Sequence, residues 1–424
     1  MSLAALRRGD LAGATHLSLA RSGLTEWPEE LSGLAETLEH LDLSGNPLTD
    51  LPSDIGRFQR LSVLFLSGTR MRRLPPALGG CAALCQIGMR AAVLHEIPAE
   101  SLPPRLRWLT VTDNALKSLP EAIGHRPYLQ KLLLSGNHVS ALPRSLEGAV
   151  NLELLRLSAN RLDHLPGWLG HLPSLAWLSW AGNRFDPPPE PAGPVIAWAR
   201  LAGDRALGEG ASGEVRAMRL VPEERPVAVK LFKGRMTSDG LPGREMAAML
   251  AAGAHPHLLP ALGRITDHPE GRDGLVLPLL HEEMRPLAGP PSPASCTRDV
   301  YAAGMRLSLT QLLVVARGIA TAMSHLHARG LSHGDLYAHN ILWDGAEAVL
   351  TDFGAASPLP PAVEAQRLMQ LESRAFGILL SELLDLCPEA AEMAELGRLA
   401  HACMAPDVAA RPDMAEVLRI LSAV

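Results

Sequence analysis

Lysine is scarce in this chain, because all but four of its basic residues are arginine. The four lysines are Lys117, Lys131, Lys230 and Lys233. The formal net charge is −6 and the sequence pI is near 6.2, so there is no basic excess that would attract a phosphate backbone. These values exclude nucleic acid as an expected partner.

Cysteines and long apolar runs are also few. The five cysteines form an odd and scattered set, which is typical of proteins whose thiols stay reduced. No apolar run approaches the roughly 18 residues that would span a bilayer, and Arg317 interrupts the apolar stretch before it. The N-terminus lacks the hydrophobic stretch of a secretory signal. We therefore expect a cytoplasmic protein with no membrane span.

The first half of the chain consists of repeats of 22 or 23 residues. Each copy reads L-x-x-L-x-L-x-x-N followed by a Leu-Pro pair, which resembles leucine-rich repeats. One such unit cannot bury its leucines alone, whereas stacked units share one continuous apolar column. An early copy begins near Ala14, and the clearer copies begin at Leu38, Leu61, Leu84, Leu106, Leu129, Leu152 and Leu175.

Two sets of residues follow from this pattern. The asparagines of successive repeats are expected to form a ladder that satisfies backbone groups at the bend after each strand. Residues that alternate with the inward leucines are expected on the concave face, and several are apolar. An exposed set of this kind indicates a protein partner, either a substrate or a regulator, or contact with the rest of the chain. The residues singled out are Phe65, Trp108, Leu154 and Trp177.

A proline-rich segment follows the last repeat. Prolines at this density cannot continue a strand or helix and favour an extended spacer. We therefore predict a repeat solenoid over residues 1–186, a linker over 187–197 and a second domain over 198–424.

Five short motifs follow one another in the second half. They are a glycine-rich turn from Leu207 to Val215, Val-Ala-Val-Lys ending at Lys230, a glutamate at 245, His-Gly-Asp with an asparagine five residues later, and Asp-Phe-Gly from Asp352. A glycine-rich turn alone is weak evidence, because ordinary hairpins also contain glycine. Five motifs in this order and at these separations resemble the eukaryotic-type protein kinases, which transfer the γ-phosphoryl group of ATP.

The resemblance implies a nucleotide site around the glycine-rich turn. Its glycines would let the backbone approach the ATP phosphates without a Cβ in the way. Lys230 would hold the α- and β-phosphates and pair with Glu245, which lies ten residues before the His255-Pro256 landmark. The residues implied in nucleotide binding are Gly208, Glu209, Gly210, Ala211, Ser212, Gly213, Val215, Ala228, Lys230 and Leu277.

The resemblance also implies a catalytic loop and a metal site. Asp335 would act as the base that orients the acceptor hydroxyl, with Lys230 and Glu245 as the other catalytic residues. Asn340 and Asp352 would bind Mg²⁺, which prefers the hard oxygen ligands that these side chains carry. ATP and Mg²⁺ are therefore the implied cofactors.

Flanking sequence extends the resemblance from about Trp198 to Leu421. The Ser308-x-x-Gln311 pattern predicts a capping box at the start of a helix whose apolar residues recur every three or four positions. The stretch that begins at Glu372 resembles the buried core helix of the kinase C-lobe, and the stretch after Arg411 resembles the last helix of the family. The pattern assigns no role to the proline-rich segment 285–308.

Three departures from the family concern the acceptor side of the site. Gly334 stands where an arginine usually receives an activation-loop phosphate, so activation by such phosphorylation is not expected. Tyr337 replaces a lysine that lies near the γ-phosphate, and His339 is a partial substitute for that charge. Only 17 residues separate Gly354 from Glu372, without an Ala-Pro-Glu motif. The platform for a peptide substrate is therefore truncated, and the arginine at 411 lacks its usual glutamate partner.

We therefore expect an α/β leucine-rich-repeat solenoid followed by a two-lobed α+β protein-kinase-like domain. The expected function is that of a Mg-ATP-dependent serine/threonine protein kinase whose repeats recruit a substrate or regulator. Two alternatives stay open. The short segment after Gly354 also fits a phosphotransferase of small molecules, similar to the aminoglycoside and sugar kinases. The other alternative is a scaffold with an idle kinase domain.

Overall fold

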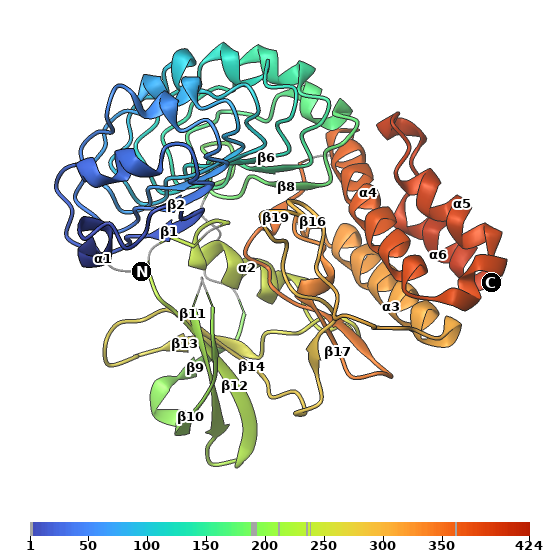
Figure 1. Cartoon of the computed structure of the whole chain (residues 1–424). Coiled ribbons are helices and arrows are strands. Elements are labelled where there is room, and N and C mark those ends of the chain that lie inside the picture. Colours follow the sequence, from blue (N-terminus) through green and yellow to red (C-terminus); the bar gives the residue numbers. More distant parts are fainter. Residues whose placement is uncertain (1–2, 188–192, 211–212, 235, 238, 361–362) are drawn as a thin grey trace. The chain divides into compact units, whose positions relative to one another are not determined.

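A computed structural model of the chain describes residues 3–187, 193–210, 213–234, 236–237, 239–360 and 363–424. The chain forms two compact units. The first comprises Met1–Leu172 and Asn183–Phe185, and the second comprises Pro173–Gly182 and Asp186–Val424. The predicted fold class is confirmed, because a repeat solenoid precedes a two-lobed α+β domain (Figure 1).

The strands of the solenoid are three residues long and arise once per repeat. Neighbouring strands from β1 to β7 pair in parallel, which sets Leu41, Leu64 and Ile87 side by side in one buried row. The strands are β1 (His16–Ser18), β2 (His40–Asp42), β3 (Val63–Phe65), β4 (Gln86–Gly88), β5 (Trp108–Thr110), β6 (Lys131–Leu133), β7 (Leu154–Arg156) and β8 (Trp177–Ser179). A short helix, α1 (Leu3–Arg7), precedes them.

Short 3₁₀ helices return the chain between strands. Most begin directly after the proline of the Leu-Pro pair, because proline fixes φ and needs no hydrogen-bond acceptor for a backbone N–H at a helix start. They are η1 (Glu29–Leu34), η2 (Ile55–Arg57), η3 (Pro76–Gly80), η4 (Ala99–Ser101), η5 (Glu121–Ile123), η6 (Arg144–Gly148) and η7 (Gly167–His171).

The predicted asparagine ladder is confirmed. Asn137 is typical: its Nδ2 donates to the carbonyls of Val111 and Leu134 at 2.9 and 2.8 Å, and its Oδ1 accepts from the Leu116 amide at 3.0 Å. Each side chain thus satisfies buried backbone groups of its own and the preceding repeat. The ladder consists of Asn46, Asn114, Asn137, Asn160 and Asn183.

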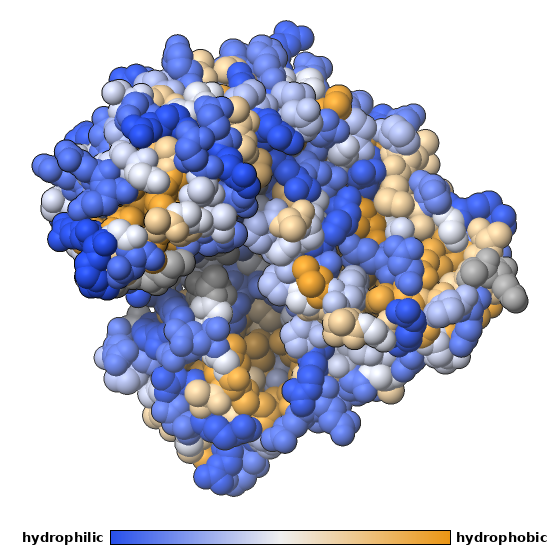
Figure 2. Space-filling view, viewed as in Figure 1, coloured by the Kyte–Doolittle hydropathy of each residue, from blue (hydrophilic) through white to orange (hydrophobic). Residues whose placement is uncertain are grey.

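The N-terminal lobe of the second unit is a six-stranded sheet in the order β10-β11-β12-β14-β13-β9. Its core contains Val227, Val229 and Val276, which are fully buried. Hydrophobic residues gather over this lobe in Figure 2, and further hydrophobic patches lie over the solenoid and the C-terminal lobe. The elements are β9 (Val195–Ala197), η8 (Trp198–Arg200), β10 (Leu201–Glu209), β11 (Gly213–Leu220), β12 (Arg225–Phe232), α2 (Pro242–Ala252), β13 (Gly263–Thr266) and β14 (Gly274–Pro278).

The ends of the repeats and of the predicted linker differ from expectation. Strand β9 begins at Val195, inside the segment 187–197 that we predicted to be a linker, and pairs with β13. Residues 188–192 of that segment lie outside the described part of the chain. Strand β8 of the last repeat belongs to the second unit. Sequence periodicity could not reveal this, because β8 carries the same repeat pattern as the strands before it.

The C-terminal lobe is mostly helical. The predicted capping box is confirmed at the start of α3, where the Gln311 amide donates to Ser308 Oγ at 3.2 Å and the Ser308 amide donates to Gln311 Oε1 at 3.0 Å. Helix α4 begins at Val363 and contains the stretch from Glu372 that resembles the core helix of the kinase C-lobe. The helices are α3 (Leu309–Ala328), α4 (Val363–Asp385), α5 (Ala394–Cys403) and α6 (Met414–Ala423).

Short strands and 3₁₀ helices complete this lobe. They are β15 (Arg285–Pro286), β16 (Leu331–Ser332), η9 (Ala338–Asn340), β17 (Ile341–Trp343), β18 (Ala348–Leu350), β19 (Ser357–Pro358), η10 (Pro388–Glu392) and η11 (Val408–Ala410). Those around β16, η9 and β18 carry the loops of the site. Within the described residues, α3 is the one helix whose length and composition would suffice for a membrane span. Its buried residues include Leu312, Ile319 and Met323, as in the core helix of a folded domain.

Candidate active site

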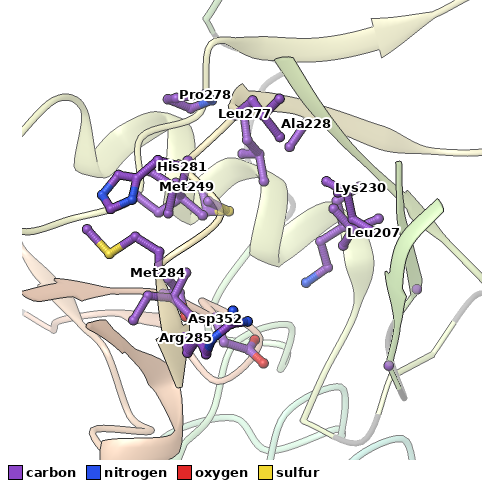
Figure 3. Close-up of a pocket in the computed structure, with 18 of the residues that line it drawn as sticks. Leu207, Ala228, Lys230, Met249, Leu277, Pro278, His281, Met284, Arg285 and Asp352 are labelled. Atoms are coloured by element: carbon purple, nitrogen blue, oxygen red, sulfur yellow. The ribbon is translucent and has the colours of Figure 1, made fainter. Parts of the chain in front are cut away.

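A cleft of about 1060 Å³ lies in the second unit. Its wall from the sheet includes Val215, Ala228 and Leu277, and its opposite side includes Leu342 and Asp352. Ala228 on β12 is in register with Leu277 on β14, which explains why these two predicted residues meet. Figure 3 shows the ammonium of Lys230 and the carboxylate of Asp352 in the same pocket as these apolar side chains. An apolar wall with a few polar groups is the usual form of a small-molecule site.

The predicted glycine-rich turn joins β10 and β11, which pair antiparallel. Gly213 must be glycine, because a Cβ there would lie 2.4 Å from the Leu231 carbonyl oxygen. Gly210, Gly213 and Val215 line the cleft. Gly208 and Glu209 lie on the exposed end of β10, where Glu209 pairs with Lys233. The predicted residues Ala211 and Ser212 lie outside the described residues.

Lys230 and Glu245 form an ion pair at the back of the cleft. Lys230 Nζ on β12 donates to Glu245 Oε1 on α2, and the two side chains are 13% and 1% exposed. Burial alone would lower the pKa of Lys230, but the carboxylates of Glu245 and Asp352 outweigh it and raise the pKa. Burial raises the pKa of Glu245 to about 7, although Lys230 opposes this shift. The lysine is therefore held as a cation beside the cleft.

Asp335 and Asn340 lie together in the loop after β16. Asn340 Nδ2 donates to the backbone oxygen of Asp335 at 2.9 Å and to its Oδ2 at 2.8 Å. The amide and hydroxyl of Thr351 donate to the Asn340 carbonyl at 2.8 Å each, which ties the loop to the residue before Asp352. The side-chain NH₂ group of Asn340 is therefore used within the loop. The side-chain oxygen of Asn340 is the atom that it would offer to a cation.

Asp352 adopts a left-handed backbone conformation, with φ of 58°. Such a conformation is uncommon for a residue with a side chain and is often found at functional sites. The Gly354 amide donates to Asp352 Oδ1 at 3.1 Å, which helps to hold the turn. The carboxylate of Asp352 and the amide oxygen of Asn340 are hard donors of the kind that Mg²⁺ prefers. The residues present therefore fit a magnesium site.

Glu372 holds the loop before Asp335 through hydrogen bonds. Its Oε1 accepts from the Gly334 amide at 2.7 Å, and its Oε2 accepts from His327 Nε2 at 2.8 Å. Burial would raise the pKa of Glu372, but the bonds from His327 and Gly334 outweigh it and hold the pKa below its ordinary value. The sequence placed Glu372 at the start of a core helix without this role. A carboxylate in an apolar helix was the available signal, because a buried charge requires partners.

Asp299 is a site residue that sequence reasoning missed. It lies in the segment 285–308, to which the pattern assigned no role. Its Oδ2 accepts from the amides of Ala338 and His339 at 2.6 and 3.2 Å, and its Oδ1 bonds His339 Nδ1 at 2.7 Å. Burial would lower the pKa of His339, but Asp299 and the charges of Asp335 and Asp352 raise it. No motif spacing could reveal Asp299, because the loop containing it meets the catalytic loop only in the folded chain.

The predicted exposed set on the concave face needs two corrections, because Trp177 and Leu154 are buried. Trp177 is 1% exposed and lies in the second unit, where its ring stacks on Tyr337 with centroids 4.2 Å apart and planes 8° apart. Trp177 is therefore not an open docking residue. Leu154, which is 5% exposed, is likewise buried and not an open docking residue, whereas Phe65 and Trp108 are half-buried in the first unit.

Comparisons with known proteins agree with both units. Residues 201–372 match the family described as protein tyrosine and serine/threonine kinase. Residues 37–58, 104–162 and 127–185 match leucine rich repeat families.

Similar curated proteins cover only parts of the chain. Mouse Vasorin is 36% identical over 124 residues, which are 28% of this chain and 18% of Vasorin. Mouse Ephrin type-A receptor 8 is 30% identical over 178 residues, 40% of this chain and 16% of the receptor. Rat Serine/threonine-protein kinase SBK2 is 29% identical over 161 residues, 36% of this chain and 40% of that kinase. The chain thus spans less than half the length of each of these relatives.

The fold and the site together define a repeat protein with a two-lobed, kinase-like domain. The family matches specify these parts: the chain has leucine-rich repeats in its N-terminal part and a domain of the protein tyrosine and serine/threonine kinase family in its C-terminal part.

Proposed function

We propose that this protein is a Mg-ATP-dependent serine/threonine protein kinase. The observation that carries the proposal is the convergence of Lys230, Glu245 and Asp352 in one cleft, beside a loop that orients Asp335 through Asn340. An idle kinase domain has no need for this set of charges, and the burial of the Lys230 and Glu245 side chains is costly without a function. We infer that the protein is active.

Each residue has a proposed part in the transfer. When bound, Mg-ATP supplies the phosphoryl group and the cation that neutralises charge on its β- and γ-phosphates. Lys230, held by Glu245, would bind the α- and β-phosphates, and Asn340 and Asp352 would hold the metal. Asp335 would accept a hydrogen bond from the acceptor hydroxyl and take its proton, in the orientation that Asn340 fixes.

The repeats are proposed to recruit a protein substrate or regulator. Phe65 and Trp108 are half-buried aromatic residues of the repeat strands, and aromatic side chains commonly anchor protein interfaces. The free state of all five cysteines supports the proposed cytoplasmic location, since thiols remain reduced there.

A small-molecule phosphotransferase is the second candidate. It is favoured by the short path from Gly354 to the start of α4 at Val363, which leaves little chain for a peptide platform. Helix α6, which follows Arg411, favours the protein kinase, as does the family match.

The test is a transfer assay with γ-labelled ATP, Mg²⁺ and the full chain, with and without casein as a generic acceptor. The variants are Asp335→Asn and Asp352→Asn, and the control is Asp163→Asn, an exposed carboxylate of the repeats. We expect label on casein or on the protein itself, carried on serine or threonine, with both site variants reduced by at least about 10²-fold.

Three outcomes would redirect the assignment. Label found on tyrosine would correct the residue specificity. Transfer to aminoglycosides or sugars but not to protein would favour the second candidate. No transfer to any acceptor, together with no rise in melting temperature at millimolar Mg-ATP, would identify an idle domain.

A further inference from the structure

The ten residues Pro173–Gly182 belong to the last repeat by sequence and to the second unit by their contacts. They contain β8 and two tryptophans, Trp177 and Trp180, which are each 1% exposed. Buried tryptophans contribute a large apolar area and a polar N–H that needs an acceptor. We call this stretch the β8 segment.

The β8 segment binds the chain that follows Asp-Phe-Gly. The amides of Trp180 and Ala181 donate to Ser357 Oγ at 3.0 and 3.2 Å, and Trp180 Nε1 donates to the Pro358 carbonyl at 3.1 Å. Ser357 is fully buried and begins β19, which pairs with β16 before the catalytic loop. The β8 segment therefore fixes the residues that a longer activation segment would otherwise position.

Trp177 binds the catalytic loop itself. Its ring stacks on Tyr337, and its Nε1 donates to the Leu336 carbonyl at 2.8 Å. Leu336 and Tyr337 directly follow Asp335 and precede the turn η9 that contains Asn340. A displacement of this strand would carry Asp335 and Asn340 with it.

Gly334 shows that the loop is shaped to receive the β8 segment. Its φ is +72°, and a Cβ there would lie 2.7 Å from both the Leu178 and the Ala355 carbonyl oxygens. Any side chain at this position would displace one of the two backbones. The departure of Gly334 from the family pattern therefore has a structural reason, which is the close approach of β8.

Arg411 provides an independent observation at the start of the β8 segment. The family pattern pairs this arginine with a glutamate, which the chain lacks. Here the guanidinium is 2% exposed and donates to the carbonyls of Pro173, Ala405 and Gln370 at 2.6, 2.8 and 3.3 Å. Arg374 Nε likewise donates to the Ser174 carbonyl at 3.0 Å. The β8 segment thus supplies an acceptor for the arginine that lost its partner.

We propose that the β8 segment replaces the missing part of the activation segment, and that Trp177 is a positioning residue for Asp335. The proposal rests on the proposed phosphotransferase function. It assigns to the last repeat a task in the kinase site and explains how the loop is held without a phosphorylated activation segment. Positioning errors of about 1 Å can reduce a rate by about 10²-fold, so the expected effect is on turnover rather than on nucleotide affinity.

The test uses the full chain with Trp177→Ala, Trp177→Phe and the control Leu396→Ala, which opens a cavity on α5 away from the site. We expect Trp177→Ala to lower kcat for casein about 30- to 100-fold while the KM for ATP changes less than about threefold. Trp177→Phe keeps a stacking ring but loses the bond to Leu336, so we expect an intermediate loss of about 3- to 10-fold. Leu396→Ala should destabilise the fold and leave kcat within twofold.

Hydrogen exchange of residues 333–340 separates this proposal from the proposed function, because it needs no substrate. Faster exchange in Trp177→Ala than in Leu396→Ala, measured well below the melting temperature, would support the positioning role of Trp177 even if the wild type transfers no phosphate. Equal exchange in the two variants would overturn the positioning role of Trp177. So would a kcat of Trp177→Ala within twofold of an active wild type. If Trp177→Ala fails to fold, Trp177→Phe decides on both measurements.

Discussion

The nucleotide side and the acceptor side of the site are built in different ways. On the nucleotide side, Lys230 and Glu245 come from a strand and a helix that are only 15 residues apart along the chain. On the acceptor side, Trp177 contacts Leu336 across 159 residues, and Asp299 contacts His339 across 40. Local motifs therefore assemble the first side, whereas distant segments hold the second.

This difference explains where the chain departs from its family. A nucleotide has fixed charge and shape, so the residues that bind it are constrained to a recognisable pattern. On the acceptor side the chain after Asp-Phe-Gly is short, and the β8 segment, which we propose to replace the missing part, bonds Ser357 and Arg411 there. Variants on the nucleotide side are therefore expected to lose nucleotide binding. Variants on the acceptor side are expected to displace the catalytic loop.

The largest expected effect is that of Lys230→Met on the nucleotide side. It removes the cation proposed to bind the phosphates and leaves Glu245 buried without its partner. We expect the phosphate-transfer rate to fall about 10²- to 10³-fold and the thermal stabilisation by Mg-ATP to disappear. Lys117→Met, in the repeats, is the matched control. A rise in melting temperature with Mg-ATP that equals that of the wild type would contradict the assignment of Lys230.

Gly334→Ala tests the acceptor side with a single added carbon. Gly334 and Gly304 have similar φ values of +72° and +76°, but only at Gly334 does a Cβ meet backbone oxygens. We expect Gly304→Ala to cost about 1 kcal/mol of unfolding free energy, as strain alone would. Gly334→Ala should cost roughly 2–4 kcal/mol, and Gly334→Arg, which restores the family residue, should cost more. Equal costs in urea denaturation at both glycines would refute the close approach of β8.

Asp299→Asn tests the second set of contacts that hold the catalytic loop, the bonds of Asp299 to Ala338 and His339. It removes the charge that raises the pKa of His339, and we expect a loss of about 1–3 kcal/mol. Because the folded pKa lies above its ordinary value of 6.5, the stabilisation by His339 is complete below about pH 6.5 and lost as pH rises through the folded pKa. The variant should therefore show a flatter decline of stability above that pH, and the His339 ring should titrate lower by NMR. An unchanged titration would sink the assigned role of Asp299.

The smallest expected effect is that of Glu382→Gln, a substitution of a carboxyl group close to Asp299. Burial, with the nearby charge of Asp299, raises the pKa of Glu382 from 4.5 to about 7, and Tyr301 Oη donates to its Oε2 at 3.0 Å. Its stabilisation is complete below pH 4.5 and lost as pH rises through about 7. Glu382→Gln should therefore stabilise the protein by roughly 1–2 kcal/mol at pH 8 and have little effect at pH 4.5. The control is Glu416→Gln, because Glu416 is an exposed carboxylate that pairs with Arg419. A gain at pH 4.5 as large as that at pH 8 would rule out titration of Glu382 as its cause.

Sequence reasoning worked best where one pattern carries both structure and chemistry. The repeat spacing predicted the parallel strands and the asparagine ladder, because each repeat solves the same burial problem. The motif spacing placed Lys230, Glu245 and Asp352 around one cleft, although their catalytic roles stay predictions. It failed for Trp177 and Leu154, because the outward face of a strand has the same sequence pattern whether it meets solvent, a partner or the same chain.

The sequence by itself determined the two architectures and the nucleotide side of the site. Periodic burial and short motifs are local properties, because the residues within one repeat or one motif are near one another along the chain. Only the tertiary structure decided that the β8 segment joins the second unit, that Asp299 bonds the catalytic loop and that Gly334 must lack a side chain. The physical reason is that these contacts join segments tens to hundreds of residues apart. Their packing and hydrogen bonds exist only once the second unit has folded, and no spacing in the sequence records them.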